Sequence, residues 1–222
     1  MMEWASTIEA VFFDMDGTLL DSEPLTERAI SQLLLRFGID DSIDGTQFHG
    51  VTWKSIAHTL QDLYPVLADV PVASELAAGF HQALISEAPP AIAGSPNAVM
   101  ASAMRLKTAV VSSSRRSSIE HVVHRMGLET HVHHIVGAED VQRSKPDPQC
   151  FQLAAERFGV SCQRCLVFED SMAGLQAARS AGMRTIAIGP SEEKGPLSDM
   201  MVSNFRHLPD GFFESLGATC RS

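Results

Sequence analysis

The sequence has few of the features that mark membrane, secreted or disulfide-stabilised proteins. No apolar run reaches the ~20 residues that a membrane-spanning helix needs. The N-terminus also lacks the charged, apolar and small-residue pattern of a secretory leader. Only four cysteines are present, Cys150, Cys162, Cys165 and Cys220. They are too few and too clustered to form a disulfide framework in a chain of 222 residues. We therefore expect a cytoplasmic globular protein that does not associate with a membrane.

Positive charge is scarce as well. The chain carries 17 lysines and arginines against 27 aspartates and glutamates, which gives a formal net charge of -10. No stretch gathers the cations into a stripe, so a nucleic-acid or anionic-membrane surface is not expected. Local basic pockets for charged metabolites are compatible with this balance. With 45% hydrophobic residues, the chain can bury a full core and hold one domain with a smaller insert.

Two clusters of potential metal ligands lack the partners that a metal site needs. Cys162 and Cys165 form a CxxC, but the pair precedes a predicted strand, and no second pair or neighbouring histidines complete a tetrad. His131, His133 and His134 occupy a short connection without acidic ligands at helical spacing. The sequence favours structural or solvated roles for both clusters.

What the sequence does contain is a buried strand that ends in two acids. Residues 8–13 form a run with two apolar faces, typical of a strand in a parallel sheet covered by helices on both sides. Asp14 and Asp16 stand at its end, two residues apart, so both carboxylates face the crevice beyond the strand. They would repel each other unless they shared a cation, and a hard divalent ion such as Mg2+ suits oxygen ligands. Gly17 and Thr18 add a tight turn and a hydroxyl.

The next segment has only helical patterns, and no convincing strand lies within it. The helices are expected at residues 22–38, 53–63 and 73–87. A stretch rich in proline and glycine at residues 88–96 then leads back toward the first strand. We expect a core domain of residues 1–21 and 93–222, with an inserted helical cap domain of residues 22–92.

Strands and helices alternate over the rest of the chain. The predicted strands cover residues 108–112, 135–136, 165–168 and 185–188, with an edge strand at 202–208. Helices are expected between them. This alternation is typical of an α/β protein with a doubly wound parallel sheet, in which ligands bind beyond the carboxyl ends of the strands.

One loop after a predicted strand is rich in hydroxyl groups. Ser112, Ser113 and Ser114 are followed by Arg115 at the start of a helix. Hydroxyls and the backbone donors of a helix N-terminus suit a phosphoryl group. An ordinary N-capping loop would have the same composition, so this alternative stays open.

Charged groups follow other strands. Lys145 stands in the sequence SKPDP, where Pro146 and Pro148 stiffen the backbone that carries one cation. Such a lysine could neutralise both a carboxylate and an incoming phosphate. Glu169 and Asp170 end a buried strand, where adjacent acids are costly unless they hold a cation. A surface lysine and an N-capping aspartate are the alternatives, but capping does not explain Glu169.

Together these segments resemble the haloacid dehalogenase superfamily of aspartate-nucleophile phosphohydrolases. The stretch DMDGTLLDSE, beginning at Asp14, is similar to the first motif of that superfamily. Ser112, Lys145 and the pair Glu169 and Asp170 are similar to its second, third and fourth motifs. The match covers nearly the whole chain and is closest to the β-phosphoglucomutase and sugar-phosphatase branch. It implies a Rossmann-like core with an all-helical cap inserted after the first strand.

The resemblance also implies a role for each motif residue. Asp14 would be the nucleophile that forms an aspartyl-phosphate, and Asp16 would act as general acid and then as base. Ser112 and Lys145 would hold the phosphoryl group. Magnesium would be bound by Asp14, the backbone carbonyl of Asp16 and Asp170, with Glu169 in or next to its shell.

The activity expected from this resemblance is that of a Mg2+-dependent phosphatase for a small phosphorylated metabolite, a sugar or sugar-acid phosphate. A phosphomutase is the alternative, but Thr26 stands where β-phosphoglucomutase has a histidine, and Trp53 where it has an arginine. A catalytically silent ligand-binding relative is a further alternative, which the filled catalytic positions disfavour. We expect a monomer. The candidate substrate-binding residues are Thr18, Ser113, Ser114, Arg115, His49, Trp53 and Lys54.

Overall fold

The computed structural model describes residues 2, 4–40, 43–48, 51–189 and 191–217. Its strands are β1 (Ala10–Phe13), β2 (Lys107–Val111), β3 (His134–Val136), β4 (Cys165–Glu169), β5 (Arg184–Ile188) and β6 (Met200–Val202). Its α-helices are α1 (Glu23–Arg36), α2 (Trp53–Leu63), α3 (Val72–Glu87), α4 (Ser95–Ala103), α5 (Arg116–Arg125), α6 (Gln149–Phe158), α7 (Met172–Ser180) and α8 (Phe212–Ser215). Short 3-10 helices include η4 (Ala138–Asp140), η6 (Glu192–Leu197) and η7 (Phe205–His207).

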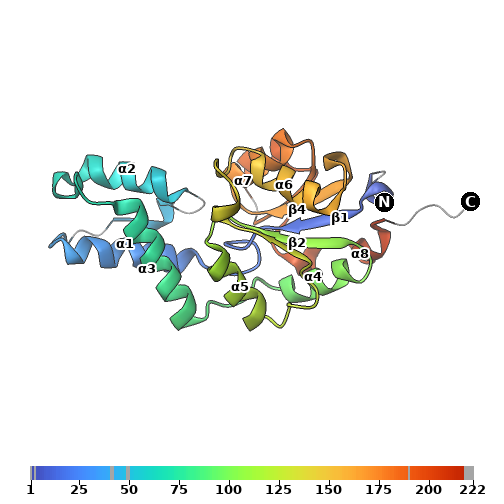
Figure 1. Ribbon diagram of the computed structural model, residues 1–222, viewed down its shortest axis with the longest axis horizontal. Coiled ribbons are helices and arrows are strands. Elements are labelled where there is room, and N and C mark those ends of the chain that lie inside the picture. Colours follow the sequence, from blue (N-terminus) through green and yellow to red (C-terminus); the bar gives the residue numbers. More distant parts are fainter. Residues whose placement is uncertain (1, 3, 41–42, 49–50, 190, 218–222) are drawn as a thin grey trace, which may run out of the picture. The chain divides into compact units, whose positions relative to one another are not determined.

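The six strands form one parallel sheet in the order β3-β2-β1-β4-β5-β6 (Figure 1). Strand β1 lies near the middle, where Phe13 is opposite Val110 of β2 and Phe168 of β4. All four residues of β1 are buried, which accounts for the apolar run on both of its faces. The predicted α/β fold with a doubly wound parallel sheet is confirmed.

Helices cover both faces of this sheet. Figure 1 shows α4, α5 and α8 on one face and α6 and α7 on the other. Neighbouring residues of β1 point to opposite faces, as the pleat of a strand requires. Phe12 packs against Phe158 of α6 with ring centroids 6.1 Å apart, and Phe13 stacks on Phe168 at 5.0 Å. The buried aromatic rings hold β1 and β4 in place, so the residues at the ends of both strands sit on a rigid base.

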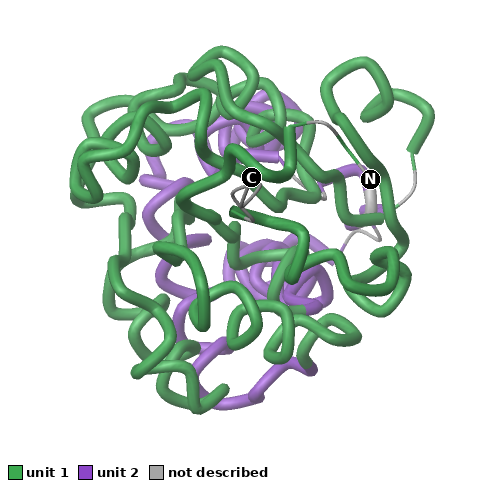
Figure 2. Tube along the Cα trace, turned by 90° about the vertical axis from the view of Figure 1, so that its right-hand side faces the viewer, with its two compact units in different colours: residues 1–20, 91–222 green, residues 21–90 purple. Residues whose placement is uncertain are grey.

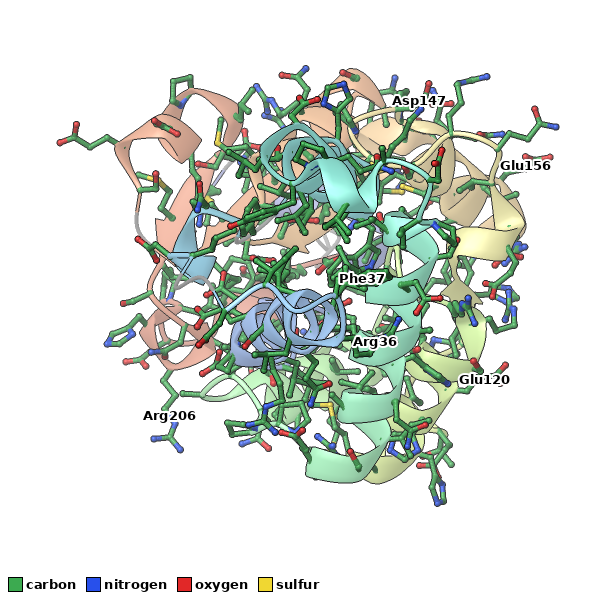
Figure 3. The ribbon with its side chains drawn as sticks, turned by 90° about the vertical axis from the view of Figure 1, so that its left-hand side faces the viewer. Arg36, Phe37, Glu120, Asp147, Glu156 and Arg206 are labelled. Atoms are coloured by element: carbon green, nitrogen blue, oxygen red, sulfur yellow. The ribbon has the colours of Figure 1, made fainter. Side chains whose placement is uncertain are left out.

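The chain divides into two compact units, one of residues 1–20 and 91–222 and one of residues 21–90 (Figure 2). The smaller unit contains the helical insertion between β1 and β2. Within it α1 and α2 pack against α3, and the ring of Trp53 lies 5.3 Å from that of Phe80. Arg36, labelled in Figure 3, forms an ion pair with Glu75 at 2.7 Å. These contacts give the smaller unit a core of its own.

The last strand differs from the sequence prediction. The edge strand expected at residues 202–208 is observed as β6, which ends at Val202. Asn204 then accepts a hydrogen bond from the backbone N–H of Arg206, and this local bond turns the chain into η7.

Among the described residues, every helix is too short or too polar to cross a lipid bilayer.

Candidate active site

The site is built at the carboxyl end of β1. Asp14 follows the strand directly, and its backbone N–H donates to the carbonyl of Phe168 in β4 at 3.0 Å. The chain then turns sharply at Gly17, whose φ of 80° falls in the left-handed region. A Cβ atom at Gly17 would lie 2.2 Å from a carboxylate oxygen of Asp170. The turn therefore needs glycine both for its backbone conformation and for the close approach of Asp170.

Lys145 reaches into the sheet end from the segment before α6. Its ammonium donates to Asp14 Oδ1 at 2.5 Å, to Glu169 Oε1 at 2.8 Å and to the carbonyl of Val111 at 3.1 Å. The side chain is only 6% exposed, so water cannot pair with the ammonium, and all three of its donor positions are used by these acceptors. This arrangement fixes one cation between two carboxylates.

Glu169 and Asp170 are held by hydrogen bonds from hydroxyl and backbone N–H groups around them. Glu169 Oε2 accepts from the backbone N–H of Ser171 at 2.6 Å and from its hydroxyl at 3.0 Å. Asp170 Oδ1 accepts from the hydroxyl of Thr18 at 2.8 Å. A Cβ atom at Gly174 of α7 would lie 1.8 Å from Glu169 Oε1, so this helical glycine leaves the space in which Glu169 lies.

Burial dominates the electrostatics of Asp14. It raises the pKa of this carboxyl well above the usual 3.8; the charge of Lys145 opposes the rise, and the neighbouring acids add to it. Burial alone would lower the pKa of Lys145, but the carboxylates of Asp14 and Glu169 raise it above its ordinary 10.5. Lys145 therefore stays charged, and one ammonium does not supply enough positive charge for the acids around it.

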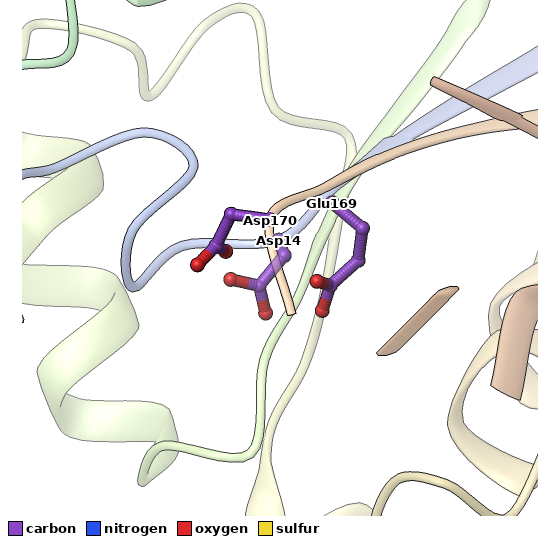
Figure 4. Close-up of side chains that lie close together, drawn as sticks. All are labelled: Asp14, Glu169 and Asp170. Atoms are coloured by element: carbon purple, nitrogen blue, oxygen red, sulfur yellow. The ribbon is translucent and has the colours of Figure 1, made fainter. Parts of the chain in front are cut away.

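Asp170 shows the same shortage of positive charge. Burial, together with repulsion from Glu169, raises its pKa from 3.8 to about 8. The hydrogen bond from Thr18 acts in the opposite direction and lowers this pKa, but by less. The carboxylates of Asp14, Glu169 and Asp170 each offer an oxygen, and these oxygens all lie within 4.8 Å of one another (Figure 4). Three carboxylates and the one ammonium of Lys145 carry a formal charge of about -2, which a divalent cation would balance. The donor set fits Mg2+, which prefers carboxylate oxygens.

Asp16 lies beyond the strand and contacts the serine loop after β2. Its Oδ2 accepts from the hydroxyl of Ser114 at 2.7 Å and from that of Ser112 at 3.3 Å. The structure thus brings together Asp14, Asp16, Ser112, Lys145, Glu169 and Asp170, which the sequence analysis selected from four separate segments. It also brings Ser114 to Asp16, although the sequence analysis assigned Ser114 to the substrate.

The other candidate substrate-binding residues are placed differently. Ser113 and Arg115 are exposed on the loop that leads into α5. Thr18 is fully buried and donates to Asp170, so it supports a carboxylate and has no surface for a substrate. Trp53 and Lys54 begin α2 in the smaller unit, and Lys54 is exposed. His49 lies outside the described residues.

Sequence reasoning did not select Lys194. It lies in η6, after β5, and its ammonium donates to the carbonyls of Ile188 and Gly189 at 3.1 and 3.2 Å. The carboxyl end of β5 is next to that of β4, and the charge of Lys194 lowers the pKa of Asp170. No motif marks this lysine, because its link to the site depends only on the neighbouring positions of two strands.

Comparisons with known proteins agree with this fold. The model of the haloacid dehalogenase-like hydrolases matches residues 8–182, so the chain belongs to this family. Within the family it is a phosphatase, as the sequence analysis expected. A 6-phosphogluconate phosphatase of Escherichia coli is 31% identical, over 91% of this chain and 92% of the relative. A fructose-1-phosphate phosphatase of the same bacterium is 32% identical, over 80% of this chain and 95% of the relative.

Solved structures show the same architecture. A β-phosphoglucomutase from Clostridium difficile superposes with a TM-score of 0.76 over 93% of this chain and 96% of that one. The two sequences are 22% identical, so this likeness establishes the fold alone. The expected relation to the branch that contains sugar phosphatases and β-phosphoglucomutase is confirmed.

Proposed function

We propose that this protein is a Mg2+-dependent phosphatase that hydrolyses a sugar or sugar-acid phosphate by way of a phosphoryl group carried on Asp14. The contact between Asp14 and Lys145 is the observation that supports this proposal. A buried carboxylate oxygen lies 2.5 Å from a buried ammonium at the end of the central strand. Repulsion between a carboxylate and a phosphate opposes nucleophilic attack, and a fixed cation beside both reduces it.

The first step transfers the phosphoryl group to the protein. A carboxylate oxygen of Asp14 attacks phosphorus, and the bond between phosphorus and the substrate oxygen breaks. Asp16 gives its proton to that oxygen, so the product leaves as an alcohol. During the transfer the hydroxyl of Ser112 exchanges its long contact with Asp16 for one with a phosphoryl oxygen, while the fixed charge of Lys145 offsets the negative charge of the phosphoryl group.

The second step returns Asp14 to its starting form. A water molecule attacks phosphorus while the carboxylate of Asp16 takes up a proton from it. The bond between phosphorus and the Asp14 oxygen breaks, and inorganic phosphate is released. Asp16 ends the cycle protonated, as it began, and the sum of the two steps is one water consumed for each phosphate ester hydrolysed.

Magnesium, when bound, offsets the negative charge of the phosphoryl oxygens and of the surrounding carboxylates. We assign Asp14 and Asp170 as its side-chain ligands, together with the backbone carbonyl of Asp16. Both carboxylate oxygens of Glu169 already accept hydrogen bonds, from Lys145 and from Ser171. We therefore assign Glu169 to fixing Lys145 and to adding negative charge beside the ion.

Two observations support a phosphorylated sugar as the substrate. The relatives at 31% and 32% identity act on 6-phosphogluconate and fructose 1-phosphate. Arg115 is exposed at the start of α5, where its guanidinium could bind a carboxylate or a second phosphate. For the mutase alternative, Trp53 is a poor replacement for an arginine, because its indole packs on Phe80 and carries no charge.

A panel of phosphorylated sugars and sugar acids, assayed for phosphate release with Mg2+, tests this proposal. We expect hydrolysis that EDTA abolishes and added Mg2+ restores, and inhibition by Ca2+, whose looser coordination spoils in-line geometry. Formation of a sugar phosphate isomer in place of inorganic phosphate would favour the mutase. Full activity in EDTA, or binding of these compounds without turnover, would contradict the proposal.

A further inference from the structure

A pair of serine hydroxyls converges on a single oxygen of Asp16. Ser114 Oγ lies 2.7 Å from Asp16 Oδ2, and Ser112 Oγ lies 3.3 Å from the same atom. The backbone N–H of Ser114 also donates to Ser112 Oγ at 3.0 Å. The shorter and stronger of the two contacts with Asp16 is therefore made by Ser114, which belongs to no motif of the sequence.

Ser114 is held firmly by the segment after β3. Its carbonyl accepts from the backbone N–H of Ala138 at 2.9 Å. A Cβ atom at Gly137 would lie 3.2 Å from this carbonyl oxygen and 3.0 Å from the backbone nitrogen of Arg116, so a side chain here would displace the neighbouring backbone by a few tenths of an ångström. Glu139 accepts from that same nitrogen at 2.9 Å. The hydroxyl of Ser114 thus projects from a backbone that is fixed on both sides.

We propose that Ser114 is a positioning residue that orients the carboxyl group of Asp16 for proton transfer, an inference that rests on the proposed function. Asp16 stands in a turn outside the strand and is only partly buried, whereas Asp14 is buried. Packing therefore restricts the side chain of Asp16 less than it restricts the side chain of Asp14. Proton transfer depends steeply on geometry, and a misplacement of about 1 Å can cost about a hundredfold in rate. A hydrogen bond to Oδ2 restricts the rotation of the carboxyl group and so keeps it in the position that proton transfer requires.

The same contact argues against direct binding of a substrate anion by Ser114. A serine hydroxyl has one hydrogen to donate. In the observed contact that hydrogen is directed to Oδ2 of Asp16, which can accept it both when the carboxyl group is ionised and when it carries its proton on Oδ1, so no donor is left for the far end of a substrate. Recognition of the substrate then falls to other residues, with Arg115 the nearest exposed cation along the chain.

The experiment compares substrates whose leaving groups differ in their need for a proton. p-Nitrophenol leaves as a stable anion, whereas an alkoxide must be protonated as it departs. We expect Ser114→Ala to reduce kcat/KM about tenfold on an alkyl phosphate without a second anion, such as glycerol 2-phosphate. On p-nitrophenyl phosphate the change should be less than about twofold, because kcat/KM covers only the steps through departure of the leaving group.

Further variants separate positioning from other roles. Ser114→Thr keeps the hydroxyl and should restore most of the lost kcat/KM. Gly137→Ala shifts the backbone next to Ser114 by a few tenths of an ångström without removing the hydroxyl, and should give a smaller loss that is also confined to the alkyl phosphate. The matched control is Ser117→Ala, which removes an exposed serine of the same helix start and should leave both substrates unchanged.

Three outcomes would overturn the proposal. These are equal losses on the two substrates, a loss confined to KM for substrates with a second anion, and no loss at all in Ser114→Ala. Failure of the proposed function would be seen differently, since the wild-type protein would then release no phosphate from any ester in Mg2+. The wild-type measurement on p-nitrophenyl phosphate therefore distinguishes the two failures.

Discussion

Lys145 donates to Oδ1 of Asp14 across 2.5 Å, and neither side chain is more than 7% exposed. The pairing places a cation that stays charged beside the carboxylate that we assign as nucleophile. Glu169 holds the same ammonium from the other side at 2.8 Å, so Lys145 cannot leave Asp14 without losing a second partner. The catalytic proposal depends on this fixed arrangement.

Replacing Lys145 should lower both activity and stability, because two buried carboxylates lose the cation between them. Without the ammonium, the phosphoryl group meets two uncompensated carboxylates, and we expect Lys145→Met to lower kcat by about a hundredfold to a thousandfold. Lys145→Arg should rescue little, because a planar guanidinium does not fit the buried space between two carboxylates. Steady-state kinetics in saturating Mg2+ check this expectation. Lys107→Met, which removes an exposed lysine of β2, is the control, and similar losses in both variants would refute the role of Lys145.

Gly174 should tolerate no side chain. Its replacement by alanine would place a Cβ atom 1.8 Å from Glu169 Oε1, and Glu169 could move only by giving up its bonds to Lys145 and Ser171. We expect Gly174→Ala to lower the melting temperature and, by displacing Glu169 and Lys145, to reduce kcat at least tenfold. A tenfold loss corresponds to an increase of about 1.4 kcal/mol in the activation free energy. Gly79→Ala is the matched helical control, since its Cβ atom would meet only Ala29 at an ordinary 3.7 Å. A stable and fully active Gly174→Ala variant would contradict the geometry of the site.

The stability of the metal-free protein should decrease as pH rises. Burial and Glu169 raise the pKa of Asp170 to about 8 in the folded protein, against 3.8 as the ordinary value. Between these values the folded protein binds a proton that the unfolded chain has lost, so the free energy of unfolding falls with increasing pH. Differential scanning calorimetry in EDTA should show this fall. Mg2+ binds the ionised carboxylates and should raise the melting temperature more near about pH 8 than near about pH 5.

Asp170→Asn tests the source of that pH dependence. The variant keeps an oxygen that can accept from Thr18 but loses the charge. It should flatten the fall in stability and remove most of the increase that Mg2+ gives to the wild-type protein. An unchanged response to Mg2+ in this variant would exclude Asp170 as a ligand.

The sequence was sufficient to predict the sheet, apart from the bounds of its edge strand β6, and the motif residues at its carboxyl edge. Asp14, Lys145 and Glu169 could be found because each follows a buried strand or stands on a stiff proline-rich segment next to a helix. The supporting contacts could not be found in this way. Thr18 meets Asp170 across 152 residues of sequence, and Ser114 meets Asp16 across 98, and neither pairing leaves a periodic or spacing signal. Such contacts depend on how loops from different strands turn, which propensity and pattern do not determine.

Arg115 and Arg116 are neighbours with different expected roles. The guanidinium of Arg116 donates to Asp140 at 2.6 Å and to the carbonyl of Ile135, which ties α5 to β3 and η4. Arg115 is exposed at the N-cap of α5. Replacing Arg116 should therefore reduce stability, whereas replacing Arg115 should change only substrate preference.

Kinetics on two substrates test this difference. Arg115→Ala should reduce kcat/KM at least tenfold for a substrate with a second anion, because a bidentate contact contributes roughly 1.5–3 kcal/mol. Hydrolysis of p-nitrophenyl phosphate should barely change. Arg206→Ala, which removes an exposed arginine of η7 (Figure 3), serves as the control for general charge effects. Equal losses on both substrates would assign Arg115 to the transferred phosphoryl group or to the fold.

The assignment of Asp14 as nucleophile is the central claim, and covalent labelling tests it most directly. The protein is mixed with a substrate carrying radiolabelled phosphate, quenched in acid within one turnover, digested and mapped by mass spectrometry. We expect label on the peptide that contains Asp14, lost on a chase with unlabelled substrate as fast as turnover proceeds, and neither label nor measurable turnover in Asp14→Asn. Stable label on another residue, or an Asp14→Asn variant that keeps even about a tenth of wild-type activity, would contradict the account.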